Sequence, residues 1–366
     1  MLHGDDSVLY CRLIKRPKSV CLQPFLHLSP FLFTSDSPTA MKFLRVPRRS
    51  LWTLSMVRSF LNPSIPHLRV LLTASGPSPE LMQLTPSYLK AITNPSDTTF
   101  PRLECSQTAP KRYDYLRSHK TMFSKSTVLP KYFFALDLRQ CVKLLPRLLG
   151  TILETIRFLG PENCALSIVE GSSTDGTYEV LLAARNTFAK AGIRYILRHS
   201  DLATNNEHRI SRLAMLRNLA LEPLVQNPQQ YNSTTTVLFI NDIAMCMEDV
   251  LELIHQKVLQ KADMTCGMDW TYLSPAPSFY DVWIARTMTG ETFFEIGKDG
   301  NWSASQNLFW SDAAALQRYN AHKPFQVFSC WNGMTAFTAQ PLFDGEVEFR
   351  ANNKSECFQG EPQLFF

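Results

Sequence analysis

The feature that most constrains the fold is a regular alternation of apolar runs and helical periods that begins near residue 131. Short apolar runs predict strands at 132–136, 164–169, 193–197, 235–240, 264–267 and 334–337. Apolar residues at helical spacing predict helices at 144–159, 175–191, 210–224 and 247–259. Strands separated by helices of this length usually pair in parallel. The sequence therefore predicts an α/β, Rossmann-type, mainly parallel sheet flanked by helices.

The N-terminal third has a different character. Residues 1–128 hold 13 of the 23 prolines, which disfavours long helices and central strands, apart from one short helix near 79–92. Residues 1–130 carry 17 Lys/Arg against 7 Asp/Glu, whereas the remainder carries 20 against 25. We expect an irregular, basic, Pro-rich extension at 1–110 and one α/β domain at 111–366. Because the basic residues lack interleaved aromatic residues, we expect no nucleic-acid partner.

Cysteine spacing and hydropathy narrow the class of protein further. Nine cysteines without a CxxC pair argue against a zinc ribbon, and the odd number leaves at least one free thiol. One or two disulfides are compatible with a lumenal chain, but the spacing does not choose the pairs. The most apolar long stretch, 51–73, is interrupted by Arg58, Pro63 and Pro66. We therefore expect no transmembrane helix or signal peptide in the chain as written.

Two predicted strands end in acidic and small polar residues. Glu170 opens the run Glu-Gly-Ser-Ser-Thr-Asp-Gly-Thr, in which Asp175 precedes a helix, and Asn241-Asp242 follows the apolar run 235–240. Ligands of open α/β sheets bind beyond such carboxyl ends. Glu170 and Asp175 are candidates to border a nucleotide, and Asp242, helped by Asn241, to hold a divalent cation. The alternatives are a capped strand-to-helix loop without a ligand and a helix N-cap.

Basic residues lie on the predicted helix between these two strand ends. Arg209 and Arg212 share a face, and Arg217-Asn218 follows one turn later. Guanidinium groups bind diphosphates with two parallel hydrogen bonds, so this helix is a candidate diphosphate site. A solvated basic helix face is the alternative.

Acids and aromatic residues alternate in the C-terminal part. They occur at 266–270, 279–283 and 328–333, and five of the six tryptophans lie between Trp270 and Trp331. Sugar sites combine aromatic faces with Asp and Asn side chains that bind hydroxyl groups, and the alternative is a set of core aromatics beside paired acids. His199 and His208 lack an H-E-x-x-H context, which argues against a zinc hydrolase.

A series of ordered blocks resembles the fungal α-1,3-mannosyltransferases of the cryptococcal capsule type, glycosyltransferase family 69. The blocks are 112–116, 131–138, 158–163, 167–170, 175–177, 217–223, 239–242, 279–283, 328–333 and 356–361. The resemblance implies a GT-A-like fold, GDP-mannose as donor, Mn²⁺ or Mg²⁺, a mannose-containing glycan as acceptor, retaining transfer and a Golgi location.

The resemblance also implies roles for individual residues. Asp242 takes the metal-binding position, with Asn241 beside it, Glu170 and Asp175 border the nucleotide, and Arg217 faces its diphosphate. Arg209 and Asn218, on the same predicted helix as Arg217, are further candidates to bind the nucleotide. Asp269, Trp331 and Asn332 line the sugar side, and Asp281 and Glu361 are candidate catalytic carboxylates. The family's paired acids are reduced here to Asn241-Asp242.

Two departures from the pattern of the resembled family leave alternative functions open. The family's N-terminal membrane helix is not visible, and relatives are expected to continue beyond residue 366, so the domain is expected to be C-terminally truncated. An inverting GT-A glycosyltransferase and a catalytically silent paralogue that binds a sugar nucleotide are the alternative functions.

Overall fold

The computed structural model describes most of the chain from residue 78 onward. The described residues are 9–11, 78–105, 111–117, 129–204, 208–273, 276–280, 282–297, 300–353, 356 and 360–365. All of them belong to one compact unit.

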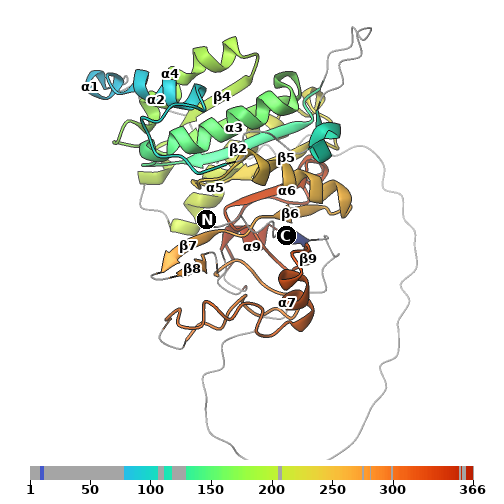
Figure 1. The fold of residues 1–366 in the computed structure, drawn as a ribbon. Helices are drawn as coiled ribbons and strands as arrows, with labels where there is room; N and C mark the ends of the chain where they lie inside the picture. Colours follow the sequence, from blue (N-terminus) through green and yellow to red (C-terminus); the bar gives the residue numbers. More distant parts are fainter. Residues whose placement is uncertain are drawn as a thin grey trace, which may run out of the picture. The chain divides into compact units, whose positions relative to one another are not determined.

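One large sheet organises this unit. Its strand order is β4-β3-β2-β5-β10-β6-β1-β9, as Figure 1 shows for the labelled strands. The strands are β1 (Leu9–Cys11), β2 (Tyr132–Leu138), β3 (Cys164–Glu170), β4 (Arg194–His199), β5 (Thr236–Ile240), β6 (Met264–Cys266), β9 (Phe325–Gln326) and β10 (Met334–Thr338). The predicted α/β fold is confirmed. The sheet is nevertheless mixed, because β10 pairs antiparallel with both β5 and β6.

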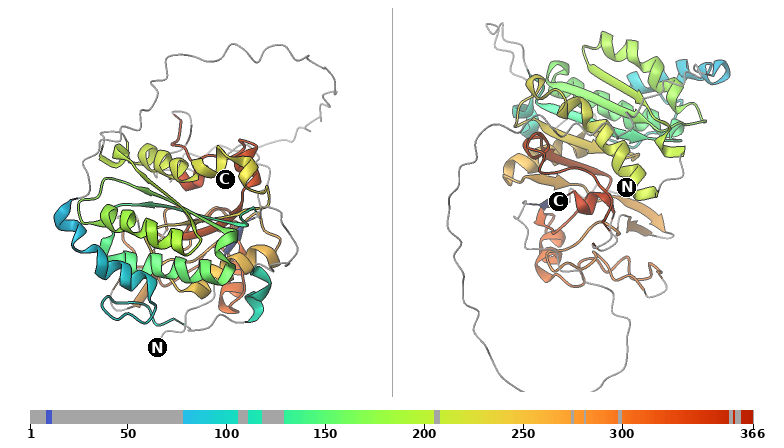
Figure 2. Two further views of the ribbon diagram at one scale, coloured as in Figure 1. Left: turned by 90° about the horizontal axis from the view of Figure 1, so that it is seen from above. Right: turned by 180° about the vertical axis from the view of Figure 1, so that it is seen from behind.

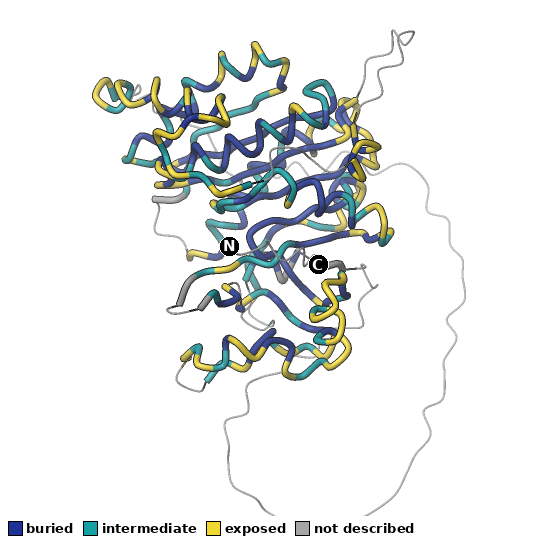
Figure 3. The backbone as a smooth tube through the Cα atoms, viewed as in Figure 1, coloured by how far each residue is buried: buried dark blue, intermediate teal, exposed yellow. Residues whose placement is uncertain are grey.

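Helices cover both faces of the sheet. They include α3 (Leu145–Leu159), α4 (Thr177–Lys190), α5 (Arg209–Val225) and α6 (Met247–Leu259). Leu136 of β2 packs in one buried cluster with α3, α4 and α6, whereas its neighbour Ala135 packs in a second cluster with α5. This is the period of two expected of a strand buried on both faces. Figure 2 shows helices on both sides of the sheet, and Figure 3 shows its buried central strands.

Smaller elements complete the unit. They are α1 (Pro79–Met82), α2 (Thr85–Thr93), β7 (Trp270–Leu273), β8 (Ala276–Phe279), α7 (Ala313–Asn320), α8 (Gln340–Phe343), α9 (Glu361–Leu364) and short 3₁₀ turns such as 142–144. The one helix expected near 79–92 is thus two helices. Tyr88 and Ile92 of α2 pack with Leu148 of α3, so this part of the expected extension lies against the core.

The path of the chain creates a topological switch point. From β2 the chain moves outward through β3 to β4 and then returns to β5, on the other side of β2. β2, β3, β4 and β5 are parallel, so their carboxyl ends share one edge of the sheet. Open α/β sheets bind ligands at such a point.

Two disulfides fix loops at this edge. Cys105 is bonded to Cys246, four residues after Asp242, and Cys266 at the end of β6 is bonded to Cys330. Cys141 and Cys164 are free, buried thiols, which agrees with the expectation of at least one free thiol.

In the part of the chain that the structure describes, no helix is both long and apolar enough to cross a bilayer, and residues 51–73 lie outside that part.

The Cys105–Cys246 disulfide is expected to stabilise the folded unit. Because the two cysteines are 141 residues apart, the cross-link strongly restricts the unfolded chain. Replacing both by serine should lower the free energy of unfolding by about 2–5 kcal/mol, measured by denaturant titration. Serine at 246 retains an N-cap for α6, so the helix start is not disturbed. Cys141→Ala, which removes a free thiol, is the control, and an unchanged midpoint in the double variant would contradict the expectation.

Candidate active site

Side chains from the ends of four strands meet at the carboxyl edge around the switch point. Asp137 is the last residue but one of β2, Asp242 lies two residues after β5, and Asp269 lies three residues after β6. Since β10 is antiparallel, the residues that precede it, Trp331 and Asn332, reach the same edge. The structure thus brings together parts of the chain that the sequence separates by almost 200 residues.

Burial raises the proton affinity of the carboxylates at this edge, and neighbouring carboxylates add to the effect at Asp137 and Asp269. Burial raises the pKa of Asp137 to about 6, Arg217 lowers it, and Glu361 and Asp242 raise it. Burial raises the pKa of Asp269 to about 6, and Asp242 again adds to the effect. Burial by the surrounding protein also raises the pKa of Asp242, although the residue is exposed, and Arg217 opposes the shift. The edge is therefore an acidic site with an excess of negative charge.

A buried ion pair lies next to these acids. Nε of Arg217 on α5 is 3.2 Å from Oε1 of Glu361 on α9, and both side chains are less than a tenth exposed. The guanidinium carbon lies 4.7 Å from the centre of the Trp331 ring and 5.5 Å from those of Phe239 and Phe349. Nη1 of Arg217 has no hydrogen-bond partner among the described residues. This nitrogen can donate to a ligand.

The turn before β10 is held against Asn241. Nε1 of Trp331 donates to Oδ1 of Asn241 at 3.1 Å, and the Asn241 N–H donates to the carbonyl of Gly333 at 2.8 Å. Gly333 has φ +79°, and a Cβ there would lie 3.3 Å from Cβ of Asp269, so a side chain would not fit. Asn332 has φ +47° and is 2% exposed, and neither polar atom of its side chain has a partner among the described residues. Buried, unpaired amides of this kind are rare, and the group is able to bind a ligand or an ordered water.

A cavity of about 180 Å³ lies at the ends of β2 and β3, beside α5. Asp137, Val169 and Gly171 line it from the sheet, and Arg209 and Arg212 line it from the first turn of α5. Arg139, the residue after β2, also lines it, so the cavity combines apolar walls with three guanidinium groups and one carboxylate. That composition suits a nucleoside with an attached diphosphate.

Three of the candidate nucleotide-binding residues hold the protein's own backbone in place. Glu170 is fully buried, and its carboxylate accepts from the Ser173 N–H at 2.7 Å and pairs with Nδ1 of His199 at 2.8 Å. Asp175 accepts from the backbone N–H groups of Val142 and Thr177. Asn218 makes two hydrogen bonds with the backbone of Phe349. Glu170 and Asp175 shape the loop beside the cavity, and Asn218 joins α5 to the C-terminal part.

The donor set fits a divalent cation that also binds substrate oxygens. Among the described residues, no group of three or more acids, histidines or cysteines is close enough to enclose a metal. Mg²⁺ and Mn²⁺ commonly use one or two carboxylates and complete their shell with water and phosphate. The charge of Asp242 adds to the effect of burial on the pKa of both Asp137 and Asp269, and a cation bound there would offset that charge. Asp242 does not cap the next helix, because Cys246 occupies that position.

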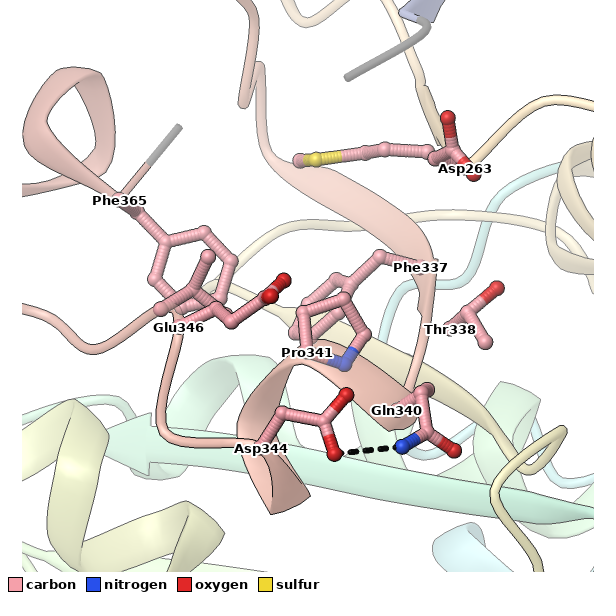
Figure 4. Close-up of a pocket in the computed structure, with 10 residues that line it drawn as sticks. Asp263, Phe337, Thr338, Gln340, Pro341, Asp344, Glu346 and Phe365 are labelled. Carbon is pink, nitrogen blue, oxygen red and sulfur yellow. Dashed lines mark hydrogen bonds between the residues drawn. The ribbon is translucent and has the colours of Figure 1, made fainter. Parts of the chain in front are cut away.

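A second, larger cavity lies away from these residues. It has a volume of about 210 Å³ and lies at the opposite end of β10, around Phe337, Phe365 and Pro341 (Figure 4). Asp344 on its rim accepts a hydrogen bond from Gln340 at 2.6 Å. None of the acids or arginines of the carboxyl edge lines it, so it is not assigned to the candidate active site.

Sequence reasoning missed Asp137. The predicted strand ended at residue 136, but the structure extends β2 through Leu138 and so brings Asp137 to the switch point. The signal was present, since Asp137 directly follows five apolar residues, and Glu170 and Asp242 likewise stand at or just after the end of a predicted strand. Asp281 lies outside the described residues.

Comparison with known proteins identifies the family. The family described as Cryptococcal mannosyltransferase 1 matches residues 131–366. The chain is 30% identical over 373 residues to the alpha-1,3-mannosyltransferase CMT1 of Cryptococcus neoformans, covering 96% of this chain and 78% of that protein. Crystal structures of S. aureus TarS residues 1–349, with and without UDP, align with TM-scores of 0.36 and 0.37 at 14% identity, over 64% of this chain and 53% of TarS. The chain belongs to the cryptococcal mannosyltransferase 1 family, and the predicted class, a glycosyltransferase, is confirmed.

Proposed function

We propose that this protein is a metal-dependent, retaining α-1,3-mannosyltransferase that moves mannose from GDP-mannose to a mannose-containing glycan. The observation that carries the proposal is the meeting of Asp137, Asp242 and Asp269 with Arg217 at the topological switch point. Family membership supports mannose as the transferred sugar, and the name of the related Cryptococcus enzyme supports the α-1,3 linkage.

The donor would lie along the edge from β3 towards β6. Its nucleoside fits the cavity at the ends of β2 and β3, where Arg209 and Arg212 face the diphosphate end. The loop that Glu170 and Asp175 hold forms one side of this cavity. Helix α5 also begins at Arg209, and the partial positive charge of a helix N-terminus favours phosphate.

A Mn²⁺ or Mg²⁺ ion would be held by Asp242, with Asn241 and Asp269 nearby. When bound, such an ion supplies positive charge that offsets the charge of the departing diphosphate. Asp269 is ionised above about pH 6 and would attract the ion together with Asp242, while the hydrogen bond from Trp331 fixes the Asn241 side chain.

The transferred mannose would lie between the cation site and the turn before β10. Asn332 offers a donor and an acceptor that no described group uses, and sugar hydroxyls need both. Arg217 offers Nη1, held in place by the aromatic rings and Glu361. Glu361 and Asp281 remain the candidate carboxylates for the reacting face of the sugar.

We also propose a Golgi location. The two disulfides of the described residues support it, because disulfides persist in oxidising secretory compartments and are rare in the cytosol. The full-length chain, fused to a fluorescent protein and expressed in a fungus, should co-localise with a Golgi marker. Diffuse cytosolic fluorescence would contradict the proposal.

Removing the carboxylate of Asp242 should abolish transfer. With Mn²⁺, GDP-mannose and an α-mannoside acceptor, wild type should form a disaccharide. Asp242→Ala should lower kcat/KM by about 100-fold or more, because charge stabilisation of the leaving group is lost. Asp344→Ala, which removes an acid at the opposite end of the sheet, is the matched control and should keep wild-type rates.

The product and the binding data separate the alternatives. NMR of an α-configured product supports retention, and a β-configured product selects an inverting transferase. Donor binding by wild type without turnover selects the catalytically silent paralogue. Equal rates in Asp242→Ala and wild type would exclude the metal role of Asp242.

The raised pKa of Asp137 predicts that its ionised carboxylate lowers the stability of the fold, although the site needs this carboxylate for transfer. A carboxyl group with a pKa near 6 in the folded chain and near 4 in the unfolded chain costs stability above pH 6, and this cost disappears as pH falls below 4. Asp137→Asn should therefore raise the free energy of unfolding at pH 7.5 by roughly 1–3 kcal/mol and by less than half of that at pH 4.5. Denaturant titrations at the two pH values test this.

The same variant should transfer mannose more slowly than wild type. Asp344→Asn serves as the control and should show neither effect. A loss of stability in Asp137→Asn at pH 7.5 would show that the Asp137 carboxylate stabilises the fold, against the expectation.

A further inference from the structure

We propose that Tyr280, Trp283 and Trp302 form an aromatic platform that binds pyranose rings of the acceptor glycan. The inference rests on the proposed function, because it concerns the second substrate of the same transferase.

The three rings form one surface cluster. Trp283 is 56% exposed and Tyr280 48% exposed, and Trp302 is partly buried. The ring centres of Trp283 and Trp302 are 5.3 Å apart, and Tyr280 lies 6.2 Å from Trp283 and 6.3 Å from Trp302. The interplanar angles are between 55° and 79°, so no two rings stack on each other. Ring faces therefore stay available to a ligand.

The core below holds the platform in position. Phe294 is fully buried and contacts Trp302 edge-on with ring centres 5.6 Å apart. Val282, which lies between Tyr280 and Trp283 in the sequence, is fully buried as well. The chain thus fixes the base of the cluster while leaving large indole surfaces in water. Exposed apolar patches of this kind mark binding sites.

The platform continues from the acidic edge. The Tyr280 N–H donates to the backbone carbonyl of Asp269 at 2.9 Å. The charge of Asp242 contributes to the raised pKa of the Asp269 carboxyl group. On the other side, a Cβ at Gly360 would lie 3.8 Å from Cγ1 of Ile284, so Glu361 follows a residue that contacts the segment after Trp283. Both ends of the platform segment therefore adjoin residues of the candidate active site.

The strand order puts the platform on the acceptor side. The nucleotide cavity lies at β2 and β3, and Asp242 follows β5. Asp269, whose backbone carbonyl accepts a hydrogen bond from Tyr280, follows β6. A donor with its nucleoside in the cavity and its diphosphate near Asp242 would point its sugar towards β6. The platform would then meet the molecule that receives this sugar.

The chemistry of the cluster favours a carbohydrate over a protein. One side of a pyranose ring presents C–H groups, which pack on aromatic faces, while its hydroxyl groups stay in water or reach acids such as Asp269. Three rings are too few for a stable protein interface, which buries roughly 800 Å² per partner. A second copy of this chain is the competing occupant, and the experiment includes it.

The test compares acceptor and donor kinetics. Trp283→Ala should raise KM for an α-linked mannotriose about five- to tenfold while KM for GDP-mannose stays within twofold of wild type. Trp283→Phe, which keeps an aromatic face, should recover most of the loss. Trp310→Ala is the matched control, because Trp310 is also exposed (42%) but is not part of the cluster.

Direct binding separates this inference from the proposed function. Saturation-transfer NMR with mannotriose and no donor should show binding to wild type that Trp283→Ala loses, even in a chain that does not transfer mannose. If wild type transfers mannose but Trp283→Ala and Trp310→Ala have equal acceptor KM values, the proposal that the platform binds the acceptor is contradicted. A dimer that Trp283→Ala abolishes, seen by light scattering, would also overturn it in favour of a second copy.

Discussion

One buried guanidinium group determines the charge balance of the candidate site. Arg217 lies among Phe239, Trp331 and Phe349, where water cannot screen it, and its ion-pair partner is the equally buried Glu361. A guanidinium group stays charged in proteins, so burying it without a partner would strongly destabilise the fold. Arg217 also lowers the pKa of Asp137 and Asp242, but it does not offset burial, which leaves both pKa values raised. The remaining negative charge makes this edge suited to a divalent cation.

Covalent and hydrogen-bonded links hold that edge together before any substrate arrives. The Cys266–Cys330 disulfide ties the end of β6 to the turn that carries Trp331 and Asn332. The hydrogen bond from Trp331 to Asn241 joins the same turn to the end of β5. Charged and polar groups fixed in this way need little reorganisation when charge develops, which is the main contribution of an active site to catalysis.

Local sequence signals predicted the regular part of the fold well. The helix at 247–259 has the predicted limits, and most other predicted ends lie within two residues of the observed ones. The strand at 334–337 was predicted, but its antiparallel direction was not, because strand direction depends on the loops and on distant partners rather than on the strand's own residues. Asp137 was missed for a related reason, since the apolar pattern ends one residue before it and only the pairing with β3 extends the strand.

The candidate site likewise combines features that the sequence determined with features that only the tertiary structure decided. The sequence by itself determined the alternation of strands and helices, and hence that acids at the ends of parallel strands would share one edge. From the sequence, Glu170, Asp175 and Asp242 were all candidate ligand-binding acids at the ends of predicted strands or in the loop that follows. The tertiary structure decided that Glu170 and Asp175 bind backbone N–H groups, while Asp242 stays exposed beside Asp269 and Arg217. The physical reason is that a carboxylate's role depends on the donors and charges around it, and these come from segments far away in the chain.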